Sequence, residues 1–279
     1  MENKFKLLSA DKQYSNTFIE LVEKGQTHHN RTGVDTKRLF GRSFEFDLES
    51  LPILTNRSVA FKNTLAELLW FISGSTKLED LHKIHPPAVK WWQDFDIGDG
   101  SIGDLYGEIY RDKNRGYFDQ IRWLEHNIKS NPDSRRLLLS SYNPYLAHKN
   151  EKKGGLYPCH GLTTQFSVGN TYLSCCTYQR SADFGCGLPH NWLSYGLLVN
   201  MLARVCGLKP GILTYFVGDL HLYNNHEPII KENMPLNTSF SHPKLTISSK
   251  PESIIDFKLD DFKLVDYKSG SKLNLPLAV

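Results

Sequence analysis

The sequence lacks the features of a membrane, secreted or disulfide-stabilised protein. No apolar run approaches the about 18 residues that a membrane-spanning helix needs, and the first residues are too charged for a signal peptide. Cysteine is scarce: the five residues form an odd set without a CxxC pair, which argues against a disulfide framework and against a zinc site. These absences predict a cytoplasmic protein with reduced thiols, no membrane association and no metal.

The sequence also has no large excess of charge of one sign. Lysine and arginine total 33 against 30 acidic residues, so the net charge is only +3, which argues against nucleic acid as the main partner. No Walker loop and no GxGxxG motif is present, so nothing predicts nucleotide binding through a glycine-rich turn. Hydrophobic residues make up 40% of the chain. Without repeats or linkers, residues 1–279 are expected to form one domain with a sizeable core.

Hydrophobic spacing predicts helices and strands that do not alternate regularly, which favours an α+β fold. Polar residues 26–43 are interpreted as a loop, and Gly169-Asn170 as a hairpin turn. Residues 85–116 are interpreted as a long loop, a feature that is often functional inside a compact domain. Helices are expected at 9–24, 62–73, 118–129 and 193–206, and strands at 43–48, 136–142, 162–168, 172–178, 212–217, 244–248, 254–258 and 262–267.

Cys159 is a candidate nucleophile, because a thiolate reacts readily once nearby positive charge lowers its pKa. The alternative is a buried cysteine that acts as a small hydrophobe. His160 is a poor partner for a Cys-His dyad, since direct neighbours in an extended segment point to opposite faces. Arginines at 31, 135, 136 and 180 are better candidates for activating the thiol and for binding phosphate, although their spacing alone also fits unrelated surface residues.

Other polar and aromatic residues suggest a ligand site. Glu67 lies in an apolar helix, where burial raises a carboxyl pKa and allows proton transfer near neutrality; a helix-face glutamate with satisfied hydrogen bonds is the alternative. Asp219, His221 and Tyr223 alternate along an extended segment and therefore share a face, which favours a polar ligand over a metal. The aromatic residues Trp91, Trp92, Phe95 and Tyr106 could stack on a flat ring or serve as packing anchors.

Ordered motifs along nearly the whole chain resemble the thymidylate synthase superfamily, so a mixed β-sheet at a dimer interface, with helices on its other face, is expected. These motifs are RTG at 31–33, FG at 40–41, AELLWFISGST at 66–76, YG at 106–107, PDSRR at 132–136, PCH at 158–160, YQRSAD at 178–183, LP-N-SY across 188–195, GD-H-Y-NH across 218–226 and LAV at 277–279.

The resemblance implies one-carbon transfer from 5,10-methylenetetrahydrofolate to C5 of a pyrimidine nucleotide. Cys159 would add to C6, Glu67 would relay protons, and Tyr106 would help to remove the C5 proton. An asparagine at 191, rather than aspartate, implies dUMP rather than dCMP. The resemblance also implies that the 5′-phosphate is bound by Arg31, Arg180 and Ser181, together with Arg135 and Arg136 from the other subunit of a homodimer. Asn191 would bind the N3/O4 edge of the base, and His221 and Tyr223 would bind the 3′-hydroxyl. Asp183 would bind the pterin, Trp92 and Arg57 would line the folate pocket, and Val279 would close over the ligands.

Departures from the synthase pattern cluster around residue 190 and resemble the phage pyrimidine hydroxymethylases. His190 replaces a phenylalanine and Gly185 replaces a bulky residue, so both are expected to admit water to the exocyclic methylene intermediate. This favours 5-hydroxymethyl-dUMP as the product, made in the host cytoplasm if a phage encodes the chain. The retained C-terminal LAV favours the alternative, a thymidylate synthase that forms dTMP. A nucleotide- or RNA-binding regulator without catalysis is a more distant alternative, because Cys159 and Glu67 are both present.

Overall fold

A six-stranded mixed sheet forms the centre of the fold in the computed structural model, which describes residues 7–112, 118–237 and 240–277. The strand order is β1-β2-β6-β5-β4-β3, and adjacent strands are antiparallel except for the parallel pair β5 and β6. Strands β7 and β8 pair separately. The bounds are β1 Gln26–His28, β2 Thr36–Asp47, β3 Leu138–Leu139, β4 Thr163–Gly169, β5 Tyr172–Asp183, β6 Lys209–Tyr223, β7 Lys244–Ile247 and β8 Phe262–Val265.

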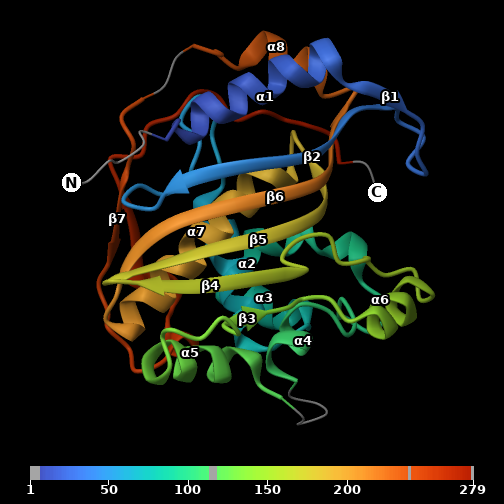
Figure 1. The fold of residues 1–279 in the computed structure, drawn as a ribbon. Helices are drawn as coiled ribbons and strands as arrows, with labels where there is room; N and C mark the ends of the chain where they lie inside the picture. Colours follow the sequence, from blue (N-terminus) through green and yellow to red (C-terminus); the bar gives the residue numbers. More distant parts are fainter. Residues whose placement is uncertain (1–6, 113–117, 238–239, 278–279) are drawn as a thin grey trace.

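Helices α7 and α2 lie behind the sheet in the view of Figure 1, while the sheet face toward the viewer is bare within the described residues. Helix α7 packs on β5 and β6, and α2 packs on α7. The α-helices are α1 Ala10–Lys24, α2 Phe61–Ser73, α3 Leu78–Ile84, α4 Gly107–Arg111, α5 Gln120–Ser130, α6 Pro144–Glu151, α7 Gly187–Cys206 and α8 Glu227–Asn233; the 3₁₀ turns are η1 Pro86–Trp91, η2 Gln93–Phe95, η3 Ile254–Asp256 and η4 Leu259–Asp261.

The alternation of side chains along β5 and β6 separates the two faces of the sheet. Thr177 and Tyr215 are paired in register and fully buried, whereas their neighbours Tyr178 and Phe216, also paired, are 41% and 43% exposed. The buried face meets α7, and the other face presents aromatic rings to solvent. The expected α+β fold, with helices on one side of a mixed sheet, is confirmed.

Local sequence signals explain the helix ends that were predicted. The Ser9 hydroxyl accepts a hydrogen bond from the Lys12 amide at 3.3 Å and caps α1. Gly74 adopts φ +84° and ends α2 in the left-handed conformation that favours glycine. Helix α2 is buried almost throughout, from Thr64 to Ile72. This burial places Glu67 inside the molecule.

Several predicted boundaries are wrong. Strand β2 begins at Thr36 and β1 covers 26–28, so residues 26–43 are not one loop. The region 136–142 contributes only the short β3, and 254–258 holds the 3₁₀ turn η3 rather than a strand. Gly169 pairs with Tyr172, so the hairpin turn lies one residue later than predicted. Residues 85–116 contain short helical turns, and α7 and β6 both extend beyond the predicted spans.

The C-terminal segment returns to the body of the protein after β8. The Gly270 amide donates to the Thr55 carbonyl at 2.9 Å, and the Pro276 carbonyl accepts from the His226 ring at 2.7 Å.

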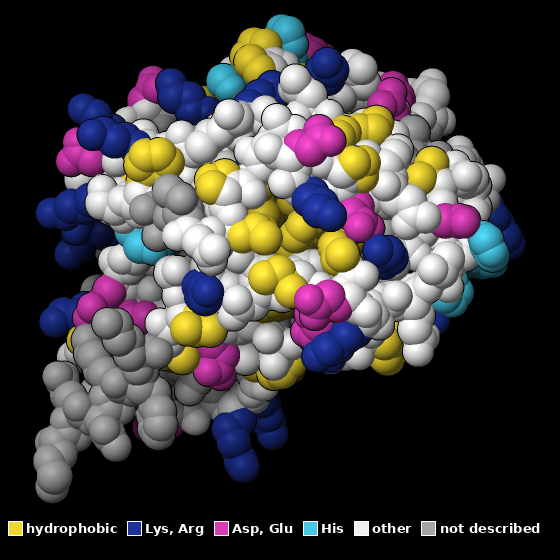
Figure 2. All heavy atoms as spheres, turned by 90° about the horizontal axis from the view of Figure 1, so that it is seen from above, with side chains coloured by type: hydrophobic (Ala, Val, Ile, Leu, Met, Phe, Trp, Pro, Cys, Tyr) yellow, Lys and Arg dark blue, Asp and Glu magenta, His cyan; other side chains and the backbone are white. Residues whose placement is uncertain are grey.

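The view from above, over α1 and α8, shows basic, acidic and apolar side chains interspersed (Figure 2). Among the described residues, no helix is long and apolar enough to cross a membrane.

Candidate active site

Cys159 lies in the loop between α6 and β4 and is tied to β5. Its carbonyl accepts from the Arg180 amide at 2.7 Å, and its own amide donates to Tyr106 Oη at 3.2 Å. Tyr106 Oη also lies 3.7 Å from Cys159 Sγ. The thiol therefore points at a phenol hydroxyl, and the backbone on both sides holds it there.

Tyr106 occupies an unusual backbone conformation, with φ +29°, that bulky residues rarely adopt. Its fully buried ring stacks on Phe71 and on His160, each with ring centroids 4.6 Å apart. Strained residues of this kind cluster at functional sites when their surroundings hold them. Here the strain directs the hydroxyl to Cys159.

His160 does not form a dyad with Cys159. Its Nδ1 lies 3.2 Å from Tyr195 Oη, and burial lowers its pKa to about 4, so the ring is neutral at pH 7. Gly161 makes this arrangement possible: its φ is +60°, and a Cβ there would lie only 1.7 Å from Tyr195 Oη. The histidine is a buried packing and hydrogen-bonding residue, and the absence of a hydrogen bond to Cys159 among the described residues agrees with the expectation that it is a poor dyad partner.

The thiol of Cys159 is less acidic in the single chain than the arginine pattern suggested. Burial raises its pKa, and the nearby Glu67 adds to the increase, while the Tyr106 hydrogen bond and the Arg180 charge lower it. The net effect is an increase. The expectation that an arginine cluster favours the thiolate is therefore not met within one subunit.

Glu67 is a buried carboxyl group that titrates near neutrality. The residue is 7% exposed, and burial raises its pKa from 4.5 to about 7, although a hydrogen bond from Trp92 opposes this increase. Trp92 Nε1 donates to Glu67 Oε2 at 2.6 Å. A group with this pKa can both give and take a proton at physiological pH.

Asn191 is held in one orientation by a chain of hydrogen bonds. Gln179 Nε2 donates to the Ser181 carbonyl at 2.7 Å, so its Oε1 faces the other way. That oxygen accepts from Tyr215 Oη at 2.5 Å and from Asn191 Nδ2 at 3.2 Å. Asn191 keeps its Oδ1 and its second N–H for a ligand. This pair of one acceptor and one donor is what the N3–H and O4 edge of uracil requires.

The parallel register of β5 and β6 brings more polar side chains to one end of the sheet. Ser181 pairs with Asp219, and Asp183 pairs with His221. Asp219 Oδ1 lies 3.0 Å from His221 Nδ1, and its Oδ2 accepts from Arg38 at 3.0 Å. As the alternation predicted, Asp219 and His221 share a face of the strand.

The five candidate phosphate residues do not all meet within one chain. Arg180 and Ser181 lie on β5, and Arg31 lies in the turn between β1 and β2, near enough to Tyr223 for its charge to lower the pKa of that phenol, which burial raises. Arg135 and Arg136 are exposed and precede β3, at the opposite edge of the sheet from β1.

Two of the predicted folate and product residues, Arg57 and Gly185, are placed differently from what the sequence suggested. Arg57 is 5% exposed, and its Nη1 donates to Tyr14 Oη at 3.0 Å and to the Gly185 carbonyl at 2.6 Å, so it does not reach outward to a folate tail. Gly185 opens no space for water, because a Cβ there would lie 2.6 Å from the His226 ring. Trp92 is 6% exposed and engaged with Glu67; its place in the folate pocket stays a prediction. Val279 lies outside the described residues.

His190 lies at the start of α7, between Trp91 and Thr64. Its ring centroid is 4.6 Å from that of Trp91, and its Nδ1 is 3.0 Å from Thr64 Oγ1. Burial, aided by the charge of Arg57, lowers its pKa to about 3, so it is neutral at pH 7. Trp91 was named in the sequence only as one of several rings that could stack on a ligand, and its contact with His190 was not predicted. Gln179 was also missed, although it lies within the YQRSAD motif.

A cysteine held against a phenol, with a buried carboxyl group of pKa about 7 and an oriented amide in the same structure, fits an enzyme that forms a covalent bond to a heterocyclic substrate. Comparison with protein families identifies the class further. The thymidylate synthase family model matches residues 12–279, nearly the whole chain, and the chain therefore belongs to this family. Membership makes it a one-carbon transferase whose substrates are dUMP and a reduced folate.

Proposed function

We propose that the protein transfers a one-carbon unit from 5,10-methylenetetrahydrofolate to C5 of dUMP through a covalent bond between Cys159 and C6, and that water completes the reaction to give 5-hydroxymethyl-dUMP. The observation that carries the proposal is the contact of Cys159 Sγ with Tyr106 Oη, close to the neutral-titrating Glu67. Cys159 supplies the electron pair for C6, which makes C5 nucleophilic. The folate supplies the methylene carbon.

Base selection rests on Asn191 and on Gln179, which orients it. Because Gln179 is anchored to the Ser181 carbonyl, Asn191 offers a fixed acceptor and a fixed donor to the substrate edge. Cytosine presents an amino group and an unprotonated N3 at the same positions, so its amino donor would face the N–H donor of Asn191, and its N3 acceptor would face the Asn191 oxygen. This arrangement supports dUMP as the substrate.

Proton transfers are assigned to Glu67 and Tyr106. Glu67, with a pKa of about 7, exchanges protons with the base through ordered water. Tyr106 Oη accepts from the Cys159 amide and is therefore held in place to assist removal of the C5 proton. Asp183, whose carboxylate is 19% exposed at the end of β5, is assigned to the pterin. The partly buried ring of Trp91, which contacts His190, fits a neighbouring position in the folate pocket.

The hydroxymethyl product is supported by the state of His190. The Thr64 hydroxyl donates to the Ala60 carbonyl at 3.2 Å, so its oxygen is left to accept a hydrogen bond from the N–H at His190 Nδ1. This tautomer keeps a lone pair on Nε2, which can accept a hydrogen bond from water and orient it for addition. The phenylalanine of the usual synthase pattern has no such acceptor. Gly185 no longer supports this assignment, since His226 fills the space beside it.

The phosphate site is proposed to be completed by a second copy of the chain. Arg31, Arg180 and Ser181 belong to one subunit, and Arg135 and Arg136 would come from the other, since they lie at the far edge of the sheet. The bare sheet face with Tyr178 and Phe216 fits the interface of such a homodimer, because exposed aromatic side chains gain most from burial.

Product analysis tests the proposal. The protein is incubated with dUMP and 5,10-methylenetetrahydrofolate, the nucleotide is identified by mass, and dihydrofolate is followed by absorbance. We expect 5-hydroxymethyl-dUMP and tetrahydrofolate. Formation of dTMP with one dihydrofolate per turnover would establish the alternative, a thymidylate synthase, which the C-terminal LAV favours. Binding of dUMP without any product would support the non-catalytic alternative.

A further inference from the structure

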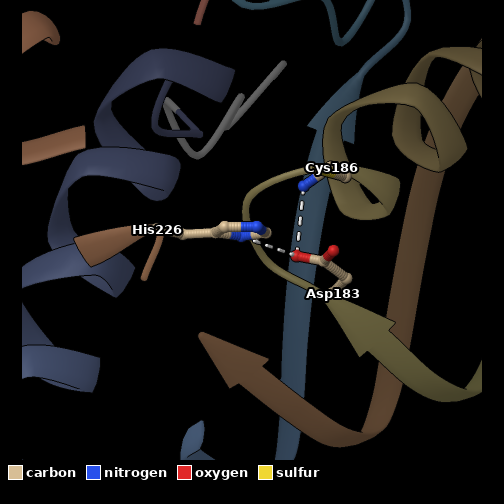
Figure 3. A group of neighbouring side chains, drawn as sticks. All are labelled: Asp183, Cys186 and His226. Atoms are coloured by element: carbon tan, nitrogen blue, oxygen red, sulfur yellow. Dashed lines mark hydrogen bonds and ion pairs between the residues drawn. The ribbon is translucent and has the colours of Figure 1, made fainter. Parts of the chain in front are cut away.

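A buried histidine ring has an unsatisfied nitrogen next to a carboxylate and a thiol. His226 is 0% exposed, and among the described residues its Nδ1 has no hydrogen-bond partner. The ring of His226 points at the Asp183 carboxylate, which the Cys186 amide also contacts (Figure 3). One ligand atom from each of Asp183, Cys186 and His226 lies within 4.8 Å of the others.

The spacing between the histidine and the carboxylate is wrong for a hydrogen bond and suitable for a shared cation. His226 Nδ1 is 3.6 Å from Asp183 Oδ1, whereas an N–H···O hydrogen bond spans about 2.7–3.2 Å. Two nitrogen or oxygen ligands of one tetrahedral zinc ion are about 3.4 Å apart, given bond lengths of about 2.1 Å. The observed distance needs little adjustment to hold such an ion.

The surrounding hydrogen bonds orient these groups as ligands. His226 Nε2 lies 2.7 Å from the Pro276 carbonyl, which can only accept, so Nε2 carries a proton and Nδ1 is available as a ligand. Asp183 Oδ1 accepts from the amides of Gly185 and Cys186 at 2.8 and 3.1 Å. These bonds fix the carboxylate toward the ring. Metal-bound histidines and carboxylates are typically supported in this way.

We infer that Asp183, Cys186 and His226 bind a thiophilic divalent cation of the Zn²⁺ type, with a fourth position open to water. On binding, the Cys186 thiol releases its proton to solvent and the sulfur forms the metal bond, with no change in oxidation state. The thiolate and the carboxylate together neutralise the ion. The site gains one positive charge beside Arg57, the same charge that protonation of His226 would add.

This cation site was not predicted from the sequence, because its ligands are spread over residues 183–226 in no metal-binding spacing. It shares Asp183 with the pterin contact proposed above, but its test is separate, because the test measures metal binding and not turnover. Its function would be to hold the loop 183–187 against the C-terminal segment, because the ligand His226 is also bonded to Pro276.

Cobalt substitution of the full-length protein tests the site. Co²⁺ added to the wild-type chain is expected to bind at one equivalent and to give visible d–d bands with a thiolate-to-cobalt charge-transfer band. Zn²⁺ should displace it. The change Cys186→Ala should remove the charge-transfer band and weaken Zn²⁺ binding by about tenfold or more, as measured by competition with a chromophoric chelator.

Cys206→Ala is the matched control, since Cys206 is also a half-buried thiol, on the last residue of α7. It should leave the spectrum unchanged. If Cys186→Ala does not fold by circular dichroism, Cys186→Ser and His226→Gln serve in its place. A wild-type chain that gives no charge-transfer band, or a band that persists in the folded Cys186 and His226 variants, would overturn the proposal and leave protonation of His226 as the way its ring is satisfied.

Discussion

The substitution Glu67→Gln should stabilise the protein at alkaline pH while it removes activity. Burial raises the pKa of Glu67 from 4.5 to about 7, so the folded protein holds this proton more tightly than the unfolded chain does. Between these two values the folded state binds more protons, and its stability therefore falls as the pH rises. Glutamine is close in shape, carries no charge and can still accept from Trp92.

The size of the effect follows from the two pKa values. Each pH unit between them is worth about 1.4 kcal/mol, so the ionised carboxylate costs about 3 kcal/mol at pH 8 and less than about 1 kcal/mol at pH 5. Urea unfolding of wild type and variant at both pH values measures the difference. Activity at pH 8 should fall by about 10²-fold or more, since a general acid–base group is lost.

Glu125→Gln is the matched control. Burial alone would raise the pKa of Glu125, but its bonds from Lys129, Ile254 and Ser253 outweigh burial and lower it. This carboxylate stabilises the fold above its unfolded pKa, and the benefit is lost only as the pH falls below the ordinary glutamate pKa of 4.5, so Glu125→Gln should destabilise the protein by a similar amount at pH 5 and pH 8. A stability gain in Glu67→Gln that is equal at pH 5 and pH 8 would refute the reasoning.

Four further substitutions test the site. Cys159→Ala should lower turnover by about 10⁴-fold or more while equilibrium dialysis still detects dUMP binding; unchanged turnover would contradict the covalent mechanism. Asn191→Asp should shift the ratio of kcat/KM for dCMP over dUMP upward by about 10²-fold or more, and an unaltered ratio would remove Asn191 from base selection. His190→Phe should replace 5-hydroxymethyl-dUMP by dTMP in the mass spectrum, and retention of the hydroxymethyl product would show that water is oriented elsewhere. Gln179→Leu leaves the donors of Tyr215 and Asn191 without their acceptor, so it should cost about 1–3 kcal/mol in urea unfolding and raise KM for dUMP; a variant with wild-type KM would show that Asn191 needs no orienting partner.

Sequence reasoning predicted the parts of the fold that depend on local periodicity. Helices α1 and α2 were located within a residue or two because Ser9, Gly25 and Gly74 mark their ends. The length of β6 was underestimated, since only its middle is apolar. Its polar end, with Asp219 and His221, is held in the strand by pairing with β2 and β5, and such pairing is not visible in the sequence.

The same limit applies to the candidate site. Motif order assembled Cys159, Glu67, Tyr106 and Asn191, and the structure brings Cys159, Glu67 and Tyr106 close together. Motif order could not show that the arginine at 57 turns inward to Gly185, or that His226, 41 residues further along the chain, fills the space that a glycine at 185 leaves. A glycine in place of a bulky residue leaves a cavity only when no residue distant in the sequence occupies the space beside it.

The charge balance at Cys159 connects the chemistry to assembly. Within one subunit, burial and Glu67 raise the pKa of the thiol more than Arg180 and Tyr106 lower it, so most molecules hold an unreactive thiol at neutral pH. Added positive charge is a means of favouring the thiolate. Arg135 and Arg136 are exposed at the far edge of the sheet, where they contribute nothing to their own site. If they enter the site of a second copy, dimer formation both completes the phosphate pocket and activates the nucleophile, and an isolated subunit would be inactive even though it holds every group that forms or breaks a bond.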